Sequence, residues 1–200
     1  MSQIDLWYAT RATGITALVL LTATVFLGIL VAGRAPSSLP AFARADLHRR
    51  ISALAVVFLA VHVLTSLLDS YVHIGWWSVV VPLVSGYHRA WLALGTVGLD
   101  LLLAVGISSV LRAHIPARAW RLLHWLAYLS WPSAVVHALG MGSDARFAWL
   151  QALIAVCAAS VAGAALWRAL VAGRARAARP ETIIRARRSL RVGAAEGAGR

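Results

Sequence analysis

The sequence predicts an all-α integral membrane protein: a bundle of five transmembrane helices with the N-terminus outside and the C-terminus in the cytoplasm. Three observations support this fold class. First, the 200 residues are 60% hydrophobic and only 13% charged, whereas about a quarter of a soluble domain is charged. Second, five apolar runs each reach about 20 residues, the length that crosses a hydrocarbon core. Third, arginines fall between these runs in an alternating pattern.

The five spans are expected at residues 12–33, 47–68, 90–111, 120–142 and 147–167. Lipid offers no hydrogen-bond partner to the backbone, so continuous apolar runs of this length are expected to be helical. The segment at residues 76–86 contains Pro82 and is too short to cross. We expect it to lie along the outer surface, with a re-entrant course as the alternative.

The orientation follows from the arginines, which supply all the positive side chains of this lysine-free chain. On one side lie Arg34, Arg44, Arg49, Arg50, Arg112, Arg118, Arg121 and nine more from Arg168 onward. The other side has only Arg11, Arg89 and Arg146. The positive-inside rule places the arginine-rich side in the cytoplasm. This distribution argues against nucleic-acid binding despite the net charge of +12, and the cell membrane of a bacterium is the expected location.

We divide the chain into a membrane domain at residues 1–172 and a basic cytoplasmic tail at residues 173–200. Residues 181–192, which follow Pro180, could form a short helix of their own. Attraction of the arginines to anionic lipid is the simpler interpretation of the tail, and docking of a cytosolic partner is the alternative. The single cysteine, Cys157, lies within an apolar run and is expected to be buried and inert.

Four histidines form two pairs at nearly equal intervals in the second and fourth spans. His48 and His62 are 14 residues apart, and His124 and His137 are 13 apart, which is roughly 20 Å along a helix in each case. Both spans start at the cytoplasmic face, so the two helices run parallel and the histidines pair by depth. Two imidazoles at each depth would suit two b-type haems with both axial positions filled, an arrangement that favours electron transfer.

Helical phase supports the first pair and challenges the second. A 14-residue step returns within roughly 40° of its start, whereas a 13-residue step misses by about 140°. Pro132 lies between His124 and His137, and proline distorts the turn that precedes it. We therefore expect a kink or an overwound turn there.

Other charged residues are candidates for cofactor or structural roles. Arg49, Arg50 and Arg121 neighbour the inner histidines and could bind haem propionates, or serve only as positive-inside anchors. Asp100, near the centre of the third span, is expected to make an interhelical hydrogen bond, with a proton relay or quinone contact as the alternative. His73, His88 and His114 are expected at the surface.

Three runs resemble the ferric reductase-like transmembrane domain family: LHRRISALAVVFLAVHVLTSLLDSY, residues 95–112, and WRLLHWLAYLSWPSAVVH. The family includes the cytochrome b part of NADPH oxidases and ferric reductases, and the bacterial haem subunit of the methionine sulfoxide reductase system. The resemblance covers residues 8–170 and implies that His48 and His124 hold an inner haem b and that His62 and His137 hold an outer one.

The resemblance also implies transmembrane electron transfer from a cytosolic donor to an extracytoplasmic acceptor. About 30 residues follow the last span, without a glycine-rich dinucleotide motif. The expected donor is therefore a separate flavoprotein, and this chain is an oxidoreductase component without its own flavin and NADPH domain. Two alternatives stay open: a quinol-linked haem subunit that serves an extracytoplasmic reductase, and a haem-free scaffold or proton-conducting bundle.

Overall fold

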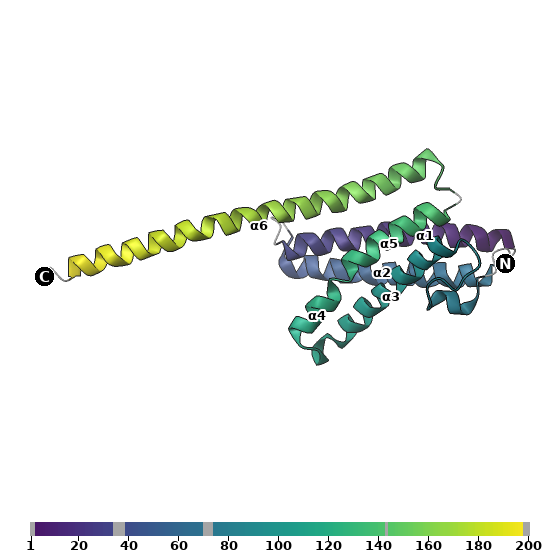
Figure 1. The fold of residues 1–200 in the computed structure, drawn as a ribbon, viewed down its shortest axis with the longest axis horizontal. Helices are drawn as coiled ribbons and strands as arrows, with labels where there is room; N and C mark the ends of the chain where they lie inside the picture. Colours follow the sequence, from purple (N-terminus) through teal and green to yellow (C-terminus); the bar gives the residue numbers. More distant parts are fainter. Residues whose placement is uncertain (1–2, 34–38, 70–73, 143, 198–200) are drawn as a thin grey trace.

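The computed structural model describes residues 3–33, 39–69, 74–142 and 144–197, with side chains up to Arg174. Within these ranges all the regular structure is helical, as predicted (Figure 1). The elements are α1 (Gln3–Ala32), α2 (Ala41–Leu68), η1 (Trp76–Val79), α3 (Arg89–Val110), η2 (Leu111–His114), α4 (Ala117–His124), α5 (Ala127–Met141) and α6 (Ala148–Gly197).

Helices occupy all five predicted spans, and four of those described are individually long and apolar enough to cross a membrane. These four are Gln3–Ala32, Ala41–Leu68, Arg89–His114 and Ala148–Arg174. The prediction of an all-α membrane protein is therefore supported, but the predicted fourth span is not one uninterrupted helix. It is divided into α4 and α5, each too short to cross alone.

The interruption lies just before Pro132, at Trp125 and Leu126. Here Leu126 N–H donates to the Leu123 carbonyl at 3.0 Å, and Leu129 N–H donates to the Leu126 carbonyl at 3.0 Å. Such bonds three residues apart belong to a tighter helix, in which each residue advances about 20° further than in an α-helix. The overwinding reduces the phase error of the 13-residue step, so the predicted distortion is present, nearly two turns before the proline itself.

Proline directly affects the turn that lies between this distortion and Pro132 itself. Its ring crowds the carbonyl four residues earlier, and it offers no N–H to that carbonyl. For Pro132 the affected carbonyl belongs to Tyr128, so the strain falls on the turn before the proline, while Pro132 itself stays inside α5.

The centre of the bundle is α1, which packs against α2, α5 and α6, while α3 packs against α5 and α4. One apolar cluster joins α1 to α6 through Val25, Ile29, Val161 and Ala164. Trp131 of α5 lies against this cluster, and its indole Nε1 donates a hydrogen bond to Thr22 Oγ1 at 2.9 Å. This bond ties the fourth predicted span to the first.

Removal of the hydrogen bond between Trp131 and Thr22 should lower the stability of the bundle by a measurable amount. We expect Trp131→Phe to lower the free energy of unfolding by about 1 kcal/mol, because interhelical hydrogen bonds in membrane proteins contribute roughly 0.6–1.7 kcal/mol. The measurement is reversible unfolding in mixed detergent micelles. The control is Trp149→Phe, at a tryptophan that is 54% exposed, and equal losses in both variants would contradict the assignment.

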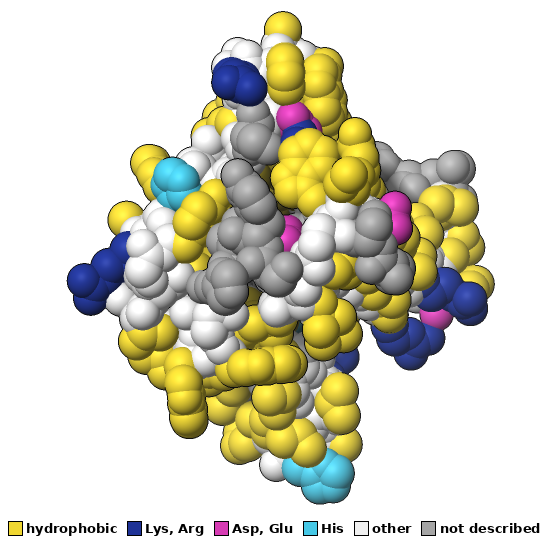
Figure 2. Space-filling view, turned by 90° about the vertical axis from the view of Figure 1, so that its right-hand side faces the viewer, with side chains coloured by type: hydrophobic (Ala, Val, Ile, Leu, Met, Phe, Trp, Pro, Cys, Tyr) yellow, Lys and Arg dark blue, Asp and Glu magenta, His cyan; other side chains and the backbone are white. Residues whose placement is uncertain are grey.

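The outer surface of the bundle is apolar. Large hydrophobic side chains lie exposed along every spanning helix, among them Val57, Leu64, Leu103 and Val156. Figure 2 shows hydrophobic side chains over much of the end from which α1 begins, with few charges between them. In a lipid bilayer these apolar side chains would contact lipid tails and would not be exposed to water.

The segment predicted to lie on the surface does not span. It forms the short turn η1 and irregular structure, with Trp76 and Trp77 about three-quarters exposed. The predicted separate helix at residues 181–192 is instead part of α6, which runs without interruption from Ala148 to Gly197 and extends well beyond the bundle (Figure 1). Cys157 is buried, as predicted.

Candidate functional site

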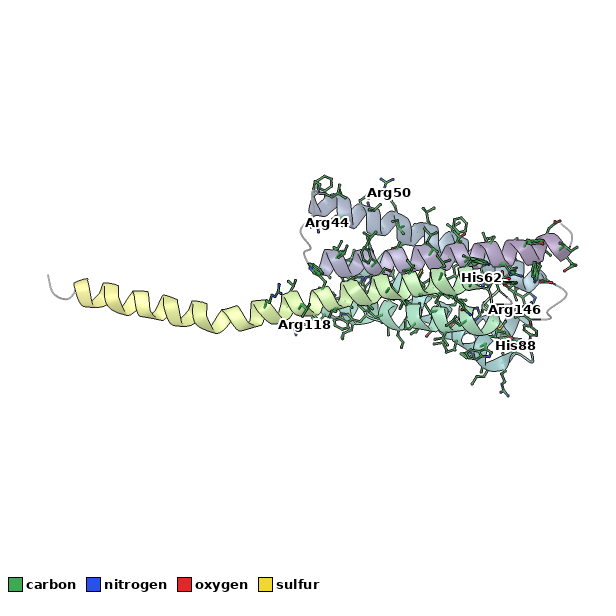
Figure 3. All side chains as sticks on the ribbon, turned by 90° about the horizontal axis from the view of Figure 1, so that it is seen from above. Arg44, Arg50, His62, His88, Arg118 and Arg146 are labelled. Carbon is green, nitrogen blue, oxygen red and sulfur yellow. The ribbon has the colours of Figure 1, made fainter. Side chains whose placement is uncertain are left out.

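The structure brings the four candidate histidines together in the two predicted pairs. The ring centres of His48 and His124 are 6.3 Å apart, and those of His62 and His137 are 6.5 Å apart. Each pair joins α2 to a helix of the fourth predicted span, and all four side chains are partly buried. Figure 3 shows His62 among the helices, toward the end that carries His88 and Arg146.

This spacing is the one that two imidazoles need to bind one metal ion from opposite sides. A metal–imidazole bond of about 2.0 Å, plus about 1.1 Å from ring nitrogen to ring centre, gives centres about 6.2 Å apart. Both observed distances lie close to this value. Direct hydrogen bonding or stacking of the rings would bring the centres closer together. Each pair therefore leaves room for an atom between its rings.

Both histidines of α2 are oriented by carbonyl groups of α1. His62 Nδ1 lies 2.8 Å from the Thr10 carbonyl oxygen, and His48 Nδ1 lies 3.1 Å from that of Thr24. A carbonyl only accepts hydrogen bonds, so each Nδ1 carries the proton and donates it. The opposite nitrogen, Nε2, keeps a free lone pair. This is the tautomer and the support that metal-binding histidines commonly have.

His137 is held in the same way by a different helix. Its Nδ1 donates to the Trp91 carbonyl of α3 at 2.9 Å. Three of the four histidines therefore have Nδ1 bonded to the carbonyl of a neighbouring helix, which leaves the lone pair of Nε2 free.

A glycine lies beside each of these three rings. A Cβ atom added at Gly14 would lie 2.8 Å from the His62 ring, one at Gly28 would lie 3.3 Å from His48, and one at Gly95 would lie 2.6 Å from His137. Contacts at or below about 3 Å require atoms to move, so a side chain at Gly14 or Gly95 would displace the ring. In each case the glycine follows the accepting carbonyl by four residues.

We call this arrangement, a carbonyl and a glycine four residues later in one helix, a carbonyl–glycine socket. The absent side chain of the glycine opens a path by which the imidazole reaches the carbonyl of the preceding turn. The two sockets of α1, Thr10–Gly14 and Thr24–Gly28, are 14 residues apart, the same interval as His48 and His62. This repeat was missed in the sequence, where it is visible as two matching Thr-x-x-x-Gly motifs.

His124 differs from the other three. Its Nδ1 is buried and has no hydrogen-bond partner among the described residues, and its ring is not among the nearest neighbours of a Cβ atom added at any described glycine. The ring instead stacks on Trp120, with centres 4.9 Å apart and planes 26° apart. The Arg112 guanidinium also lies over the Trp120 ring, 4.4 Å from its centre.

A cavity of about 440 Å³ adjoins the outer pair, lined by both His62 and His137. Cofactor sites are typically concave, mostly apolar and about 300–1,000 Å³ in volume. The lining surface is mostly apolar, with Gly14, Gly95 and many aliphatic side chains, and it also includes polar side chains such as Thr10, Arg11 and Asp144. The two socket glycines therefore contribute space to the cavity as well as access to the carbonyls.

The lining of this cavity includes an ion pair between Arg11 and Asp144. The Arg11 guanidinium also lies 3.9 Å from the centre of the Trp7 ring. From the sequence, Arg11 is expected to be an ordinary membrane-surface anchor, with binding of an outer haem propionate as the alternative. The structure places this partly buried guanidinium in the lining of the cavity, paired with Asp144.

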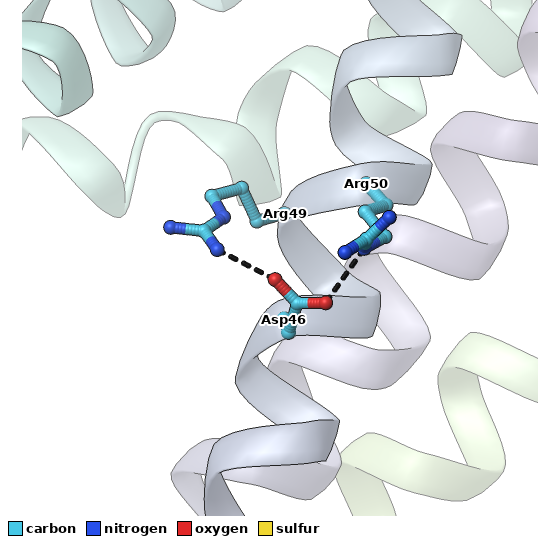
Figure 4. Close-up of polar contacts among 3 residues, drawn as sticks. All are labelled: Asp46, Arg49 and Arg50. Atoms are coloured by element: carbon cyan, nitrogen blue, oxygen red, sulfur yellow. Dashed lines mark hydrogen bonds and ion pairs between the residues drawn. The ribbon is translucent and has the colours of Figure 1, made fainter.

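The arginines predicted for the inner end are engaged differently. Arg49 and Arg50 both donate to the Asp46 carboxylate, at 2.5 and 2.6 Å, and their side chains are 80% and 76% exposed (Figure 4). Arg121 is exposed. A role of these three arginines in cofactor binding stays a prediction. Asp46, which neutralises part of their charge, was missed because an acidic residue among arginines looks like ordinary surface.

Asp100 makes no hydrogen bond or ion pair with any described residue, so the interhelical bond predicted for it is not found. It is also not among the residues that line the outer cavity. His88 is exposed and lies at the same end of the bundle as Arg146 (Figure 3), and His114 is exposed as well. His73 lies outside the described residues.

In the described part of the chain, no three His, Cys, Asp or Glu side chains come together as a metal-binding group. The site is therefore made of histidine pairs, which suit a metal that already has other ligands. Comparisons of the chain with models of protein families, with curated proteins and with solved structures find no match. The family resemblance drawn from the sequence accordingly stays a prediction.

Proposed function

We propose that this protein carries electrons across a membrane through two b-type haems, each held by one of the two histidine pairs. The observation that carries the proposal is the spacing of ring centres, 6.3 and 6.5 Å, in two pairs whose histidines are 14 residues apart on α2 and 13 residues apart across α4 and α5. Haem supplies four of the metal's ligands itself, so two opposed imidazoles complete its coordination and leave it suited to one-electron transfer.

The residues present fit such a group. The outer cavity is concave, largely apolar and bordered by both histidines, and the socket carbonyls of Thr10 and Trp91 hold the imidazoles in the neutral, metal-binding tautomer. Arg11, which lines the cavity, could bind a haem propionate in place of the Asp144 carboxylate. At the inner end, Arg49, Arg50 and Arg121 are near enough in sequence to His48 and His124 to do the same.

The orientation of the two histidine pairs in the membrane is inferred from the arginines. Arg44, Arg50 and Arg118 lie at the end from which α6 extends, whereas His88 and Arg146 lie at the opposite end (Figure 3). The positive-inside rule then supports a cytoplasmic inner pair and an extracytoplasmic outer pair in a bacterial plasma membrane. A cytosolic flavoprotein would supply electrons to the inner haem, and ferric iron, oxygen or a redox protein would receive them outside. A quinol is the alternative donor.

The decisive experiment is to purify the full chain in mild detergent from cells supplied with a haem precursor. We expect the sharp visible bands of reduced low-spin haem, and two haems per chain by the pyridine haemochrome assay. A colourless, helical protein would overturn the proposal and leave the haem-free scaffold or proton-conducting bundle. A count of one would reduce the pathway to a single haem.

A further inference from the structure

The inner and outer histidine pairs are not built alike. In the outer pair both histidines sit in carbonyl–glycine sockets, on α1 for His62 and on α3 for His137. In the inner pair only His48 has a socket, through Thr24. The fourth socket, which would belong to His124, is missing from the described structure.

The sequence of α3 explains the missing socket. The residues 13 to 14 positions beyond Gly95, where a second glycine would repeat the interval of the histidines, are Ser108 and Ser109. Both hydroxyls donate to the Val105 carbonyl, at 3.0 and 2.7 Å. A Cβ at the nearest glycine, Gly106, meets nothing within 4 Å, so no side chain is seated against it. The Val105 carbonyl of this turn thus already accepts hydrogen bonds from the hydroxyls of Ser108 and Ser109.

The position of His124 in its helix is also different. His124 is the last residue of the eight-residue helix α4, directly before the overwound turn. The other three histidines lie inside helices of at least 15 residues. What holds the His124 ring is its stack on Trp120, whose own Nε1 is likewise buried without a hydrogen-bond partner among the described residues. Stacking fixes a ring far less in direction than a hydrogen bond does.

We propose that His124 is an exchangeable ligand, and that a small neutral molecule which binds ferrous haem can enter the inner site on the His124 side. The inference rests on the proposed function. In the exchange, the bond between iron and His124 Nε2 breaks and a bond from iron to the entering molecule forms, with no change in the number of electrons. The outer site, with both imidazoles fixed through Nδ1, stays closed to the same molecule.

Carbon monoxide is the probe, because it binds only to ferrous haem with an open or opened axial position. We expect the reduced two-haem protein to bind about one carbon monoxide per chain, seen as a shift of half of the haem absorbance. In His62→Ala, which removes an outer ligand, the remaining inner haem should still bind carbon monoxide. In His48→Ala, which removes an inner ligand, the outer haem should not bind carbon monoxide. Reaction of the outer haem there would overturn the inference, as would two low-spin haems that both resist carbon monoxide.

A second variant tests the role of the sockets themselves. Gly95→Ala places a Cβ 2.6 Å from His137 Nδ1 and so should unseat this histidine, which then resembles His124. We expect carbon monoxide binding to rise from about one to about two per chain. The matched control on the same helix is Gly106→Ala, where the added Cβ meets nothing and binding should stay at one. No rise in Gly95→Ala would overturn the role of the socket, whereas absence of haem from the unaltered chain would overturn the proposed function instead.

Discussion

His62→Ala is expected to remove the outer haem and to lower the haem content from two to one per chain. An outer haem that loses one axial imidazole also loses the bond that spans from α2 to α5, and alanine leaves no group to replace it. The socket at Thr10 and Gly14 then holds no ligand. The measurement is the pyridine haemochrome count together with the reduced-minus-oxidised spectrum of the purified full chain.

The matched control for this variant is His88→Ala. His88 lies at the same end of the molecule but is exposed and outside the bundle (Figure 3), so two haems should be kept. Helix content by circular dichroism reports whether each variant is folded. Two haems in a folded His62→Ala protein would show that His62 is not a ligand, and loss of both would show that the two sites are not independent.

The parts of the fold that depend on composition and period could be predicted from the sequence. Apolar runs of about 20 residues gave the positions of the helices, because the need to satisfy the backbone in lipid leaves few alternatives. The two histidine pairs were also predictable, since equal intervals on two parallel helices bring residues to equal depth. His48 pairs with His124, and His62 with His137, as expected.

Features that depend on contacts between helices could not be predicted in the same way. The overwound turn at Trp125 and Leu126 was expected only as a consequence of Pro132, without its position. The separation of α4 from α5 followed from the same turn, and no hydropathy window detects it. Asp100 was expected to bond another helix, yet nothing in its own segment indicates which side of α3 faces a partner.

The sockets are the largest feature of the site that sequence reasoning missed. Glycine in a membrane helix has several causes, of which close helix packing is the commonest, so Gly14 and Gly28 carried no clear signal alone. The role of these two glycines can be recognised only when their 14-residue interval on α1 is compared with the 14-residue interval of the histidines on α2. Because α1 and α2 are antiparallel and the sockets and the histidines are both 14 residues apart, each histidine of α2 lies beside one socket of α1.

The second large effect is expected from Gly14→Ala, which should weaken haem binding at the outer site by about 10- to 100-fold. This is the usual consequence of removing a group that orients a metal-binding histidine. The added Cβ would lie 2.8 Å from both Cε1 and Nδ1 of the His62 ring, so the ring must move and its bond to the Thr10 carbonyl, 2.8 Å long, must lengthen or break. The measurement is the rate and extent of haem transfer to an excess of a soluble haem-binding protein.

The control separates this effect from a general change of helix stability. Alanine is a better helix former than glycine by about 1 kcal/mol, so a substitution without contacts should leave the protein equally or more stable. Gly163→Ala on α6 is such a case, because its added Cβ meets nothing within 4 Å. If Gly14→Ala and Gly163→Ala release haem at the same rate, the glycine acts only through helix packing. If only Gly14→Ala releases it faster, while both proteins unfold at similar denaturant concentrations, the socket is what holds His62 in its binding position.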